Sequence, residues 1–449
     1  MTAAVSLTDE VVIDASPGGR EPAASKGTRP VSFLFAAAVG VAVRLWVVAG
    51  VAPSWWQDSY DYDAVGSNAV LSRALWLGER PPLMPMLLGA TGGEPGHGLV
   101  LAQAVVAGLC WAWLAAEMAT WVSCRWVATA VVACVVAFSL SDPVVMWDIQ
   151  ALTESLTLSL MAATTAAALR FGSTRSWAAG ATLVVTATAW CLARDTVAAA
   201  MFVASFAAMI GLRRRREVVV VGGALLLVAV LSMAMASSAG RGDVPTSHLF
   251  FARVLPFPER LDWFEDRGMP RVEAFHAAVP PLEGPHIVAA PEDDPQFERW
   301  WEWFDHEGSA AWRSYVAHYP WFLVAEPVRE PERVYNNGEG SVTMYRPAEL
   351  PKVPVASALM WPSLLVTLAG LSIGGVAALR RSLWSGPAAV AGLLALGSGV
   401  YAAVAWHSDA MESARHVFIG GAMARLALVV LVGGLVEPVR VALRRRADI

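Results

Sequence analysis

The chain has 449 residues, of which 56% are hydrophobic and only 16% are charged, and its mean hydropathy is +0.49. This composition excludes an ordinary soluble protein, and apolar runs of about 20 residues recur, each long enough to cross a bilayer as a helix. The formal net charge of −5 hides an asymmetry, because arginines cluster in short connections whereas acidic residues cluster in two longer ones. We therefore predict an all-α, polytopic membrane protein.

The first 30 residues differ from the rest of the chain. Residues 1–30 are rich in Ala, Ser, Gly and Pro, lack periodic apolar spacing and end with Arg20, Lys26 and Arg29. We interpret them as a disordered cytoplasmic tail. A cleaved signal peptide is the competing interpretation. It is less favoured, because the apolar run that follows is of spanning length and contains Arg44.

Apolar segments recur after the tail and predict about ten transmembrane helices. They lie near residues 32–52, 98–119, 126–141, 151–170, 176–193, 196–212, 217–237, 355–379, 386–406 and 416–436. The fifth and sixth segments are separated only by Arg194 and Asp195. Because charges are costly at the bilayer centre, we expect a tight hairpin there rather than one overlong helix. A count of nine or eleven spans is the alternative.

The positions of the arginines predict the orientation. If the N-terminus is cytoplasmic, the cytoplasmic connections carry Arg125, Arg170 with Arg175, Arg213 to Arg216, Arg380 with Arg381, and Arg440 with Arg444 to Arg446. This arrangement satisfies the positive-inside rule. We therefore expect a multi-pass protein of the cytoplasmic membrane, with both termini in the cytoplasm and the acidic loops on the outer face.

This topology divides the chain into four predicted parts. They are the tail at 1–30, an N-terminal transmembrane module at 31–237 that includes the first outer loop at 52–97, an outer segment at 238–354, and a C-terminal module at 355–449 with a basic tail. The outer segment contains tryptophans at 263, 300, 301, 303, 312 and 321. Its apolar spacing predicts short amphipathic helices. We expect a small helical cap whose tryptophans form its own core, lie at the membrane interface or stack on sugars.

The first outer loop carries an acidic cluster. A helix-compatible stretch follows Trp55 and ends at Pro81-Pro82. On a helix, Asp58, Asp61 and Tyr62 share one face. A carboxylate there can accept a proton from an attacking hydroxyl or hold a divalent cation beside a phosphate. The alternative is an acidic, solvated loop that keeps this segment out of the membrane.

The order DSYDY, a helical stretch, Gly78 and RPPLMPMLLG resembles the first outer loop of GT-C type membrane glycosyltransferases. It is most similar to the polyprenyl-phosphate-sugar-dependent branch that includes protein mannosyltransferases and aminoarabinose transferases. The resemblance implies that Asp58 is the catalytic base and that Arg80 contacts the donor phosphate. The run LTESL at 152–156 resembles the "S/T-E" that opens the fourth span of that family. Glu412 to His416 resembles its acidic-x-x-Arg-Tyr pattern, with histidine in place of tyrosine.

Glu154 begins an apolar run, where a carboxylate is costly to bury unless it is paired or coordinated. The resemblance favours a second catalytic position, which would orient the acceptor or, together with Asp58, hold a divalent cation. The alternative is a structural role, because a negative charge is favourable at the N-terminal end of a helix.

Arg194 and Arg415 stand at the predicted outer ends of spans. A guanidinium group suits phosphate oxygens because it can bind them bidentately, so both are candidates for the donor phosphate. The alternative is local pairing, of Arg194 with Asp195 and of Arg415 with Glu412 or Asp409. The auxiliary candidates are Asp61, Tyr62, His407, Glu412 and His416. Within the spans, Arg44 needs a partner or a path along which its side chain reaches the membrane surface, and Glu117 in the second span is the candidate partner.

With the resemblance, these residues predict a hexosyl- or pentosyltransferase that moves a sugar from a polyprenyl phosphate to a hydroxyl of a glycan, lipid or protein acceptor, with inversion, in cell-envelope synthesis. A lipid-linked saccharide flippase or a non-enzymatic envelope-assembly protein is the alternative, and a polymerase or ligase with a diphosphate-linked donor is a third. A flippase should carry ionisable residues deep within several spans. No phosphate loop, zinc spacing or basic-aromatic pattern predicts a nucleotide-hydrolysing domain, a zinc centre or a nucleic-acid partner.

Overall fold

The computed structural model describes residues 28–93, 96–241, 243–277, 294–329, 345–351, 386–408 and 413–447. Within these ranges every regular element is a helix, and extended pairing is limited to one isolated parallel bridge between Ser54 and Gln150. The predicted all-α class is therefore confirmed for the part of the chain that the structure describes. Residues 1–27 of the predicted tail and the predicted segment near 355–379 lie outside the described residues. The last three residues predicted as tail, 28–30, instead form the start of a helix.

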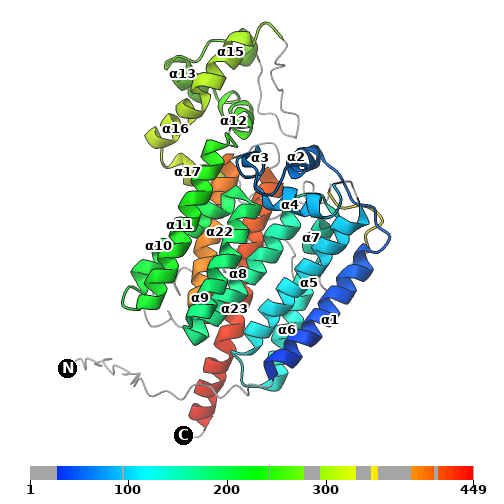
Figure 1. The fold of residues 1–449 in the computed structure, drawn as a ribbon. Coiled ribbons are helices and arrows are strands. Elements are labelled where there is room, and N and C mark those ends of the chain that lie inside the picture. The colour runs from blue at the N-terminus through cyan, green and yellow to red at the C-terminus, as the bar shows by residue number, and fades with distance from the viewer. Residues whose placement is uncertain are drawn as a thin grey trace, which may run out of the picture.

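Long helices pack side by side in one bundle (Figure 1). They are α1 (Thr28–Val48), α5 (His97–Ala119), α6 (Arg125–Ser139), α8 (Glu154–Thr174), α9 (Trp177–Ala193), α10 (Asp195–Gly211), α11 (Arg216–Ser238), α22 (Pro387–Ser408) and α23 (Ser413–Ala447). Each predicted apolar segment within the described residues corresponds to one of them. The expected tight hairpin is also present, because α9 ends at Ala193 and α10 begins at Asp195.

Only some of these helices are long and apolar enough to cross a membrane on their own. They are His97–Ala119, Arg216–Ser238, Pro387–His407 and Arg415–Gly434, which makes four among the described residues. A fifth results if Arg125–Ser139 and Asp142–Ile149, which meet at a bend of 56°, form one broken span. These helices suggest a membrane protein, and the count of ten spans stays a prediction.

Small residues allow the helices to approach closely, as in membrane bundles generally. At Gly108 of α5, an added Cβ atom would lie only 2.9 Å from the Cα atom of Val41 in α1. Along α8, Ala162, Ala166 and Ala167 are fully buried between neighbouring helices. At these positions the helices therefore pack with their backbones close together, without large side chains between them.

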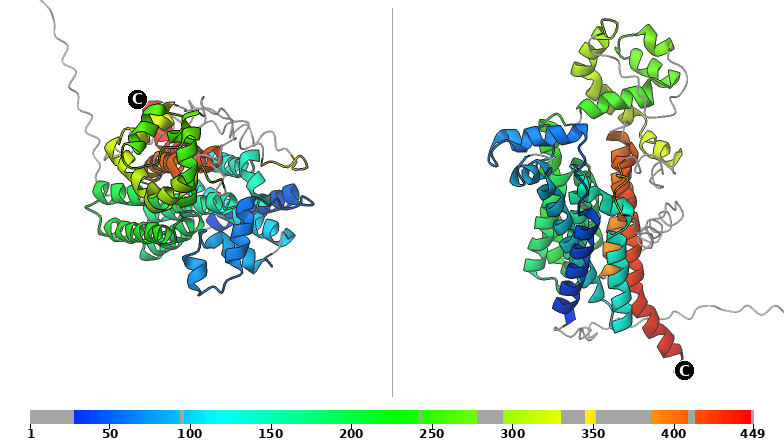
Figure 2. Two further views of the ribbon diagram at one scale, coloured as in Figure 1. Left: turned by 90° about the horizontal axis from the view of Figure 1, so that it is seen from above. Right: turned by 90° about the vertical axis from the view of Figure 1, so that its right-hand side faces the viewer.

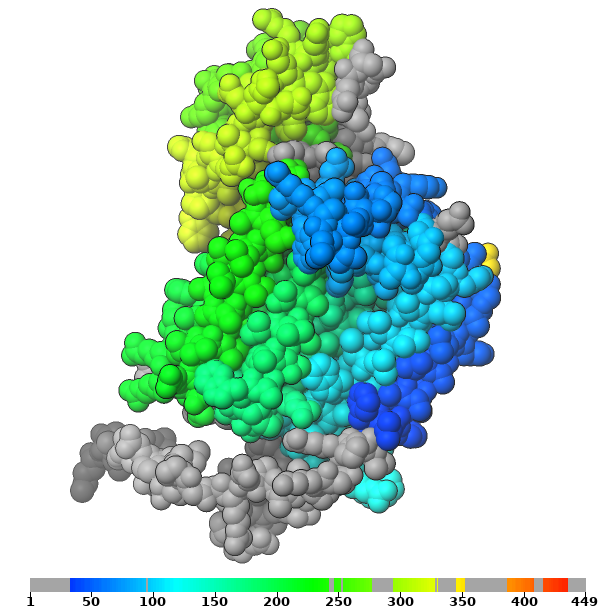
Figure 3. Space-filling model, in the orientation of Figure 1, coloured from blue at the N-terminus to red at the C-terminus, as the bar shows by residue number. Residues whose placement is uncertain are grey.

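Three short helices lie across one end of the bundle: α2 (Gln57–Gly66), α3 (Arg73–Trp76) and α4 (Leu83–Ala90) (Figures 1 and 3). We call this the loop end. The opposite end, which carries Arg213 to Arg216 between α10 and α11, is the basic end. The expected helical stretch after Trp55 is interrupted, because Ser72 caps a new helix by accepting a hydrogen bond from the backbone N–H of Leu75 at 3.2 Å.

A second group of helices extends beyond the loop end (Figure 2). It comprises α12 (Asp243–Leu249), η2 (Phe250–Val254), α13 (Pro258–Glu265), α14 (Glu273–Ala277), α15 (Glu298–Trp303), η3 (Phe304–Gly308), α16 (Ser309–His318) and α17 (Phe322–Arg329). Trp263, Trp300, Trp303 and Trp312 are buried in its own aromatic core, whereas Trp321 is 80% exposed. Of the roles considered for these tryptophans, the core accounts for the four buried ones. That these helices form a cap on the outer face of a membrane stays a prediction.

The predicted pairing of Arg44 with Glu117 is wrong. Arg44 instead donates to Asp148 and, at 2.5 Å, to the carbonyl oxygen of Ser139. Glu117 pairs with Arg170 at 3.2 Å. In the sequence, Arg44 and Glu117 are two charges in neighbouring spans without an evident partner. In the structure they lie near opposite ends of the bundle, and each pairs with a residue of another segment.

Candidate active site at the loop end

The first loop is held against the start of α8 by paired backbone. The N–H of Ser54 donates to the carbonyl of Ile149 at 2.8 Å, and the N–H of Ala151 donates to the carbonyl of Ser54 at 3.0 Å. The hydroxyl of Ser59 donates to the carbonyl of Ala151 at 2.9 Å. These contacts bring Asp58, at the start of α2, close to Glu154, at the start of α8.

Asp58 and Asp61 face the same guanidinium group. Nη2 of Arg80 lies 2.8 Å from Oδ1 of Asp58 and 2.5 Å from Oδ2 of Asp61. The guanidinium carbon of Arg80 lies 5.6 Å from the ring centroid of Tyr62. The predicted shared face of Asp58, Asp61 and Tyr62 is therefore confirmed, and Arg80 is the group that this face contacts.

Arg415 joins this cluster to Glu154. Its Nη2 donates to Oδ2 of Asp58 at 2.6 Å, and its Nε lies 3.0 Å from Oε1 of Glu154. The same Glu154 oxygen accepts a hydrogen bond from Nη1 of Arg194 at 2.6 Å. Six side chains thus alternate in charge in the order Asp61, Arg80, Asp58, Arg415, Glu154 and Arg194, which we call the ion-pair chain.

The ion-pair chain runs from the surface into the protein. The exposed fraction of the side chain falls from 41% for Asp61 and 30% for Arg80 to 21% for Asp58, and it is 4% for Arg415, 0% for Glu154 and 8% for Arg194. Buried charges are tolerated only when they are paired. Each member therefore depends on its neighbours, and Asp58 is the carboxylate at the boundary between the surface and the interior.

Electrostatics keep Asp58 ionised. Burial alone would raise the pKa of its carboxyl group, but the positive charges of Arg415 and Arg80 outweigh burial and lower this pKa below its usual value of 3.8. The neighbouring phenol behaves in the opposite way, because burial and the negative charge of Asp58 raise the pKa of Tyr62 to about 12. At neutral pH the site thus contains a carboxylate beside a neutral phenol.

The five main candidates, Asp58, Arg80, Glu154, Arg194 and Arg415, meet in one cluster, together with Asp61 and Tyr62. The local pairing considered for Arg194 is not observed, because Asp195 pairs with Arg241 at 3.0 Å. His416 lies near enough to Asp58 and Glu154 to interact electrostatically with both.

Two auxiliary candidates stand apart from the cluster. His407 is bonded elsewhere, with its Nε2 3.1 Å from the carbonyl oxygen of Leu323 in α17. Glu412 lies outside the described residues.

Three residues near the site were not predicted from the sequence. Gln150 bridges two segments, because its Oε1 accepts from Nε1 of Trp56 at 2.6 Å and its Nε2 donates to the carbonyl of Tyr345 at 2.7 Å. The ring of Tyr345 lies 5.8 Å from the guanidinium carbon of Arg415. Arg241 donates to the carbonyls of Gly78 and Trp76 at 2.8 Å each, and so it holds the loop that leads to Arg80. Nothing in the local sequence marks these long-range contacts.

A divalent cation does not fit this arrangement well. Asp58 and Glu154 both face guanidinium groups, which a cation would have to displace against their positive charge. Among the described residues, no three His, Cys, Asp or Glu side chains are grouped as metal ligands. We therefore derive no chemical step through a metal ion.

Comparison with known proteins does not assign a family. No protein-family model matches the chain, and no curated protein is significantly similar to it in sequence.

Proposed function

We propose that the protein is a membrane glycosyltransferase that transfers a sugar from a polyprenyl-phosphate donor to an acceptor hydroxyl at the outer face of the cytoplasmic membrane. The observation that supports this function best is the position of Asp58, a partly exposed carboxylate with a guanidinium group on each side, Arg80 at 2.8 Å and Arg415 at 2.6 Å. Transfer of a sugar from a phosphate to a hydroxyl is favoured by a base that accepts the hydroxyl proton and by positive charge that stabilises the leaving phosphate. A carboxylate and two guanidinium groups lie together here.

Arg80 has the capacity to bind a phosphate while it contacts carboxylates. A guanidinium group carries five N–H donors, and the pairs of Arg80 with Asp58 and Asp61 engage only Nε and Nη2. A phosphate oxygen bound by Arg80 and Arg415 would offset their charges. The same event would raise the pKa of Asp58, because these two charges are what lowers it. Donor binding would thereby make Asp58 a stronger base.

In the proposed reaction, Asp58 accepts the proton of the acceptor hydroxyl, whose oxygen forms a bond to the anomeric carbon. The bond from that carbon to the phosphate oxygen breaks, and polyprenyl phosphate leaves with the electron pair. Attack opposite the leaving group inverts the anomeric centre. Arg80, Arg415 and Arg194 stabilise the charge that develops on the phosphate, as preorganised groups in a site of low dielectric.

The test is sugar transfer in proteoliposomes that contain equal amounts of wild-type protein or a variant, with a panel of labelled polyprenyl-phosphate sugars and mixed glycan, lipid and peptide acceptors. Asp58→Asn removes the base and should reduce transfer by about 10²- to 10⁴-fold, the usual contribution of a positioned base. Asp63→Asn is the matched control, because Asp63 is in the same helix but makes no ion pair with Arg80. It should keep transfer near the wild-type rate.

Two results would contradict the proposal. Full activity of Asp58→Asn would leave the enzyme class standing and remove Asp58 as the base. Failure of the wild type to transfer from any donor, combined with transbilayer movement of the same labelled lipids, would favour the flippase alternative.

A further inference from the structure

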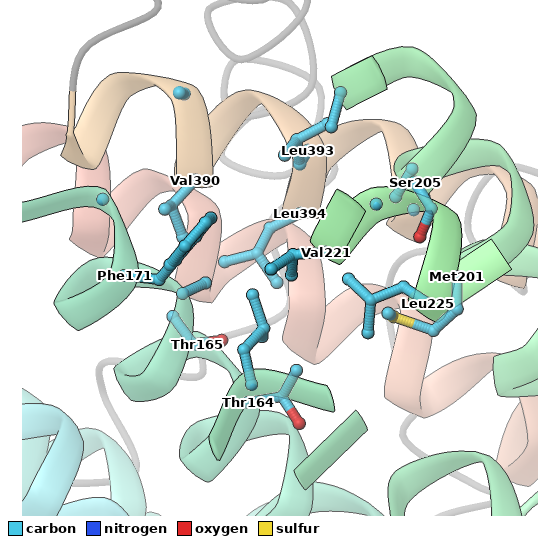
Figure 4. A pocket seen from close by; sticks show the side chains of 18 of the residues that line it. Thr164, Thr165, Phe171, Met201, Ser205, Val221, Leu225, Val390, Leu393 and Leu394 are labelled. Carbon is cyan, nitrogen blue, oxygen red and sulfur yellow. The ribbon is translucent and has the colours of Figure 1, made fainter. Parts of the chain in front are cut away.

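A cavity lies within the bundle (Figure 4), and no member of the ion-pair chain lines it. It has a volume of about 150 Å³, is partly open, and is bounded by α8, α9, α10, α11, α22 and α23. Its walls reach Phe171 near the end of α8, Leu212 just after α10 and Val218 near the start of α11. These positions all lie at the basic end, so the cavity extends to the level of the arginine-rich connections.

The cavity walls are almost entirely hydrocarbon. Leucine, valine, alanine and methionine side chains from several helices line it, among them Leu394, Leu225 and Met201 (Figure 4). An apolar cavity of this volume in a soluble protein takes up small hydrocarbons rather than water. Beside a bilayer, the hydrocarbon available in excess is the acyl chain of a lipid. The volume accommodates a segment of one chain, not a whole lipid.

Positive charge gathers at one rim of the cavity. Arg175 itself lines the cavity, with its guanidinium carbon 5.7 Å from the ring centroid of Phe171. Burial lowers the pKa of Arg175, and the nearby charge of Arg215 lowers it further, while Glu217 acts in the opposite direction. Arg175 and Arg215 thus set two positive charges against the one carboxylate of Glu217, and Arg213, Arg214 and Arg216 adjoin Arg215 in the sequence. An anionic group at this rim would reduce that repulsion.

We propose that this cavity is a binding site for an anionic phospholipid of the leaflet at the basic end, with part of one acyl chain between α8, α10 and α22 and the phosphate at Arg175 and Arg215. Basic residues at the ends of transmembrane helices recognise anionic headgroups in this way. The proposed phosphate position is separate from the proposed catalytic centre, because Phe171, which contacts Arg175, and Glu154 stand at opposite ends of α8, about 25 Å apart along its axis.

The test measures lipid retention by the full-length protein, released from nanodiscs and weighed intact by native mass spectrometry. The probes are dioleoyl phosphatidylglycerol, dioleoyl phosphatidylcholine of the same chain length, and polyprenyl phosphate. The wild type should retain phosphatidylglycerol in preference to phosphatidylcholine. Arg175→Gln should weaken phosphatidylglycerol binding about fivefold, the effect of one arginine near an anionic headgroup. Arg125→Gln, which removes an exposed charge elsewhere at the basic end, should not.

A second pair of variants tests the apolar part. Ala204→Phe and Ala208→Phe would each place a ring in the cavity and should abolish the preferential retention. Ala207→Phe, on the same helix but not in the cavity wall, is the control and should behave as the wild type. Equal retention of the two phospholipids, or unchanged retention in the three cavity variants, would overturn the proposal. Retention of polyprenyl phosphate in place of phosphatidylglycerol, lost in the same variants, would also overturn it by assigning the cavity to the donor chain.

Discussion

Within the ion-pair chain, the protonation of Asp58 depends on Arg415. Burial of the carboxyl group favours its neutral form, and the charges of Arg415 and Arg80 overcome that tendency. The pKa of Asp58 therefore lies below 3.8 in the folded protein. Its ionised form is present above that value and is lost only as the pH falls through the lowered pKa.

Arg415→Gln should consequently move the acid limb of kcat/KM for sugar transfer to higher pH, because burial then acts with less opposition and the pKa of Asp58 rises. The pH dependence of kcat/KM is the suitable measurement, since it reports the free enzyme. Arg415→Lys keeps the charge and should leave the limb near its wild-type position. Its rate should still be lower, because an ammonium group cannot reach two carboxylates as a planar guanidinium does. An unshifted limb in Arg415→Gln would show that Asp58 is not the titrating base.

Glu154 and Glu117 permit a matched comparison of two buried carboxylates. Glu154→Gln would leave two buried arginines, Arg194 and Arg415, without their shared carboxylate. Breaking a buried pair in this way costs about 3 to 5 kcal/mol. Glu117→Gln should cost about 1 kcal/mol or less, because its partner Arg170 is 49% exposed and remains hydrated. Thermal unfolding in one detergent measures both, and equal losses of stability would contradict the role assigned to Glu154.

The sequence identified the members of the ion-pair chain but not their pairing. Glu154 and Arg194 are 40 residues apart, and Asp58 and Arg415 are 357 apart. Residue type and position at a predicted span end are local properties. The choice between Asp195 and Glu154 as the partner of Arg194 depends on how the helices pack. The same limit explains why the partner of Arg44 was predicted wrongly.

Among the elements, the position of α2 depends on its close contact with α4. A Cβ atom at Gly66 would lie 2.6 Å from the carbonyl oxygen of Pro85, and one at Gly89 would lie 2.8 Å from the carbonyl oxygen of Gly66. Both obstacles are backbone atoms, which cannot rotate away. Since α2 carries Asp58, Asp61 and Tyr62, any shift of this helix changes their distances to Arg80.

Gly66→Ala should therefore displace α2, destabilise the protein by about 1 to 3 kcal/mol, as overpacking does, and reduce sugar transfer. Gly223→Ala in α11 is the control, because nothing lies within 4 Å of its added Cβ atom. Hydrogen exchange of residues 57–66 provides a readout that does not require activity. Exchange and transfer at wild-type levels in Gly66→Ala would mean that α2 tolerates a wider spacing than the structure indicates.

Predictions at the level of elements succeeded where the signal was local. The apolar runs predicted the long helices, and the charged pair Arg194-Asp195 predicted the break between α9 and α10. The interruption between α2 and α3 was missed, although the capping side chain of Ser72 is a local signal for it. The bridge from Ser54 to Gln150 joins two loops distant in sequence, and no periodicity predicts it.

For the whole molecule, the two ends of the bundle differ in charge and in construction. The loop end holds the ion-pair chain beneath three short helices, whereas the basic end carries Arg213 to Arg216. The helices α12 to α17, which share an aromatic core, lie beyond the loop end and not at the basic end (Figure 2). The positive-inside rule concerns short loops of this kind, and it predicts that the basic end faces the cytoplasm.

Labelling of single cysteines tests this orientation. In a protein whose native Cys110, Cys124, Cys134 and Cys191 are replaced by serine, Leu71→Cys marks the loop end at a side chain that is 94% exposed, and Arg214→Cys marks the basic end. A membrane-impermeant maleimide applied to intact cells should label Leu71→Cys and should reach Arg214→Cys only after permeabilisation. The reversed pattern would put the ion-pair chain on the cytoplasmic side. Transfer at the outer face would then be excluded, because Asp58 and both flanking arginines belong to the loop end.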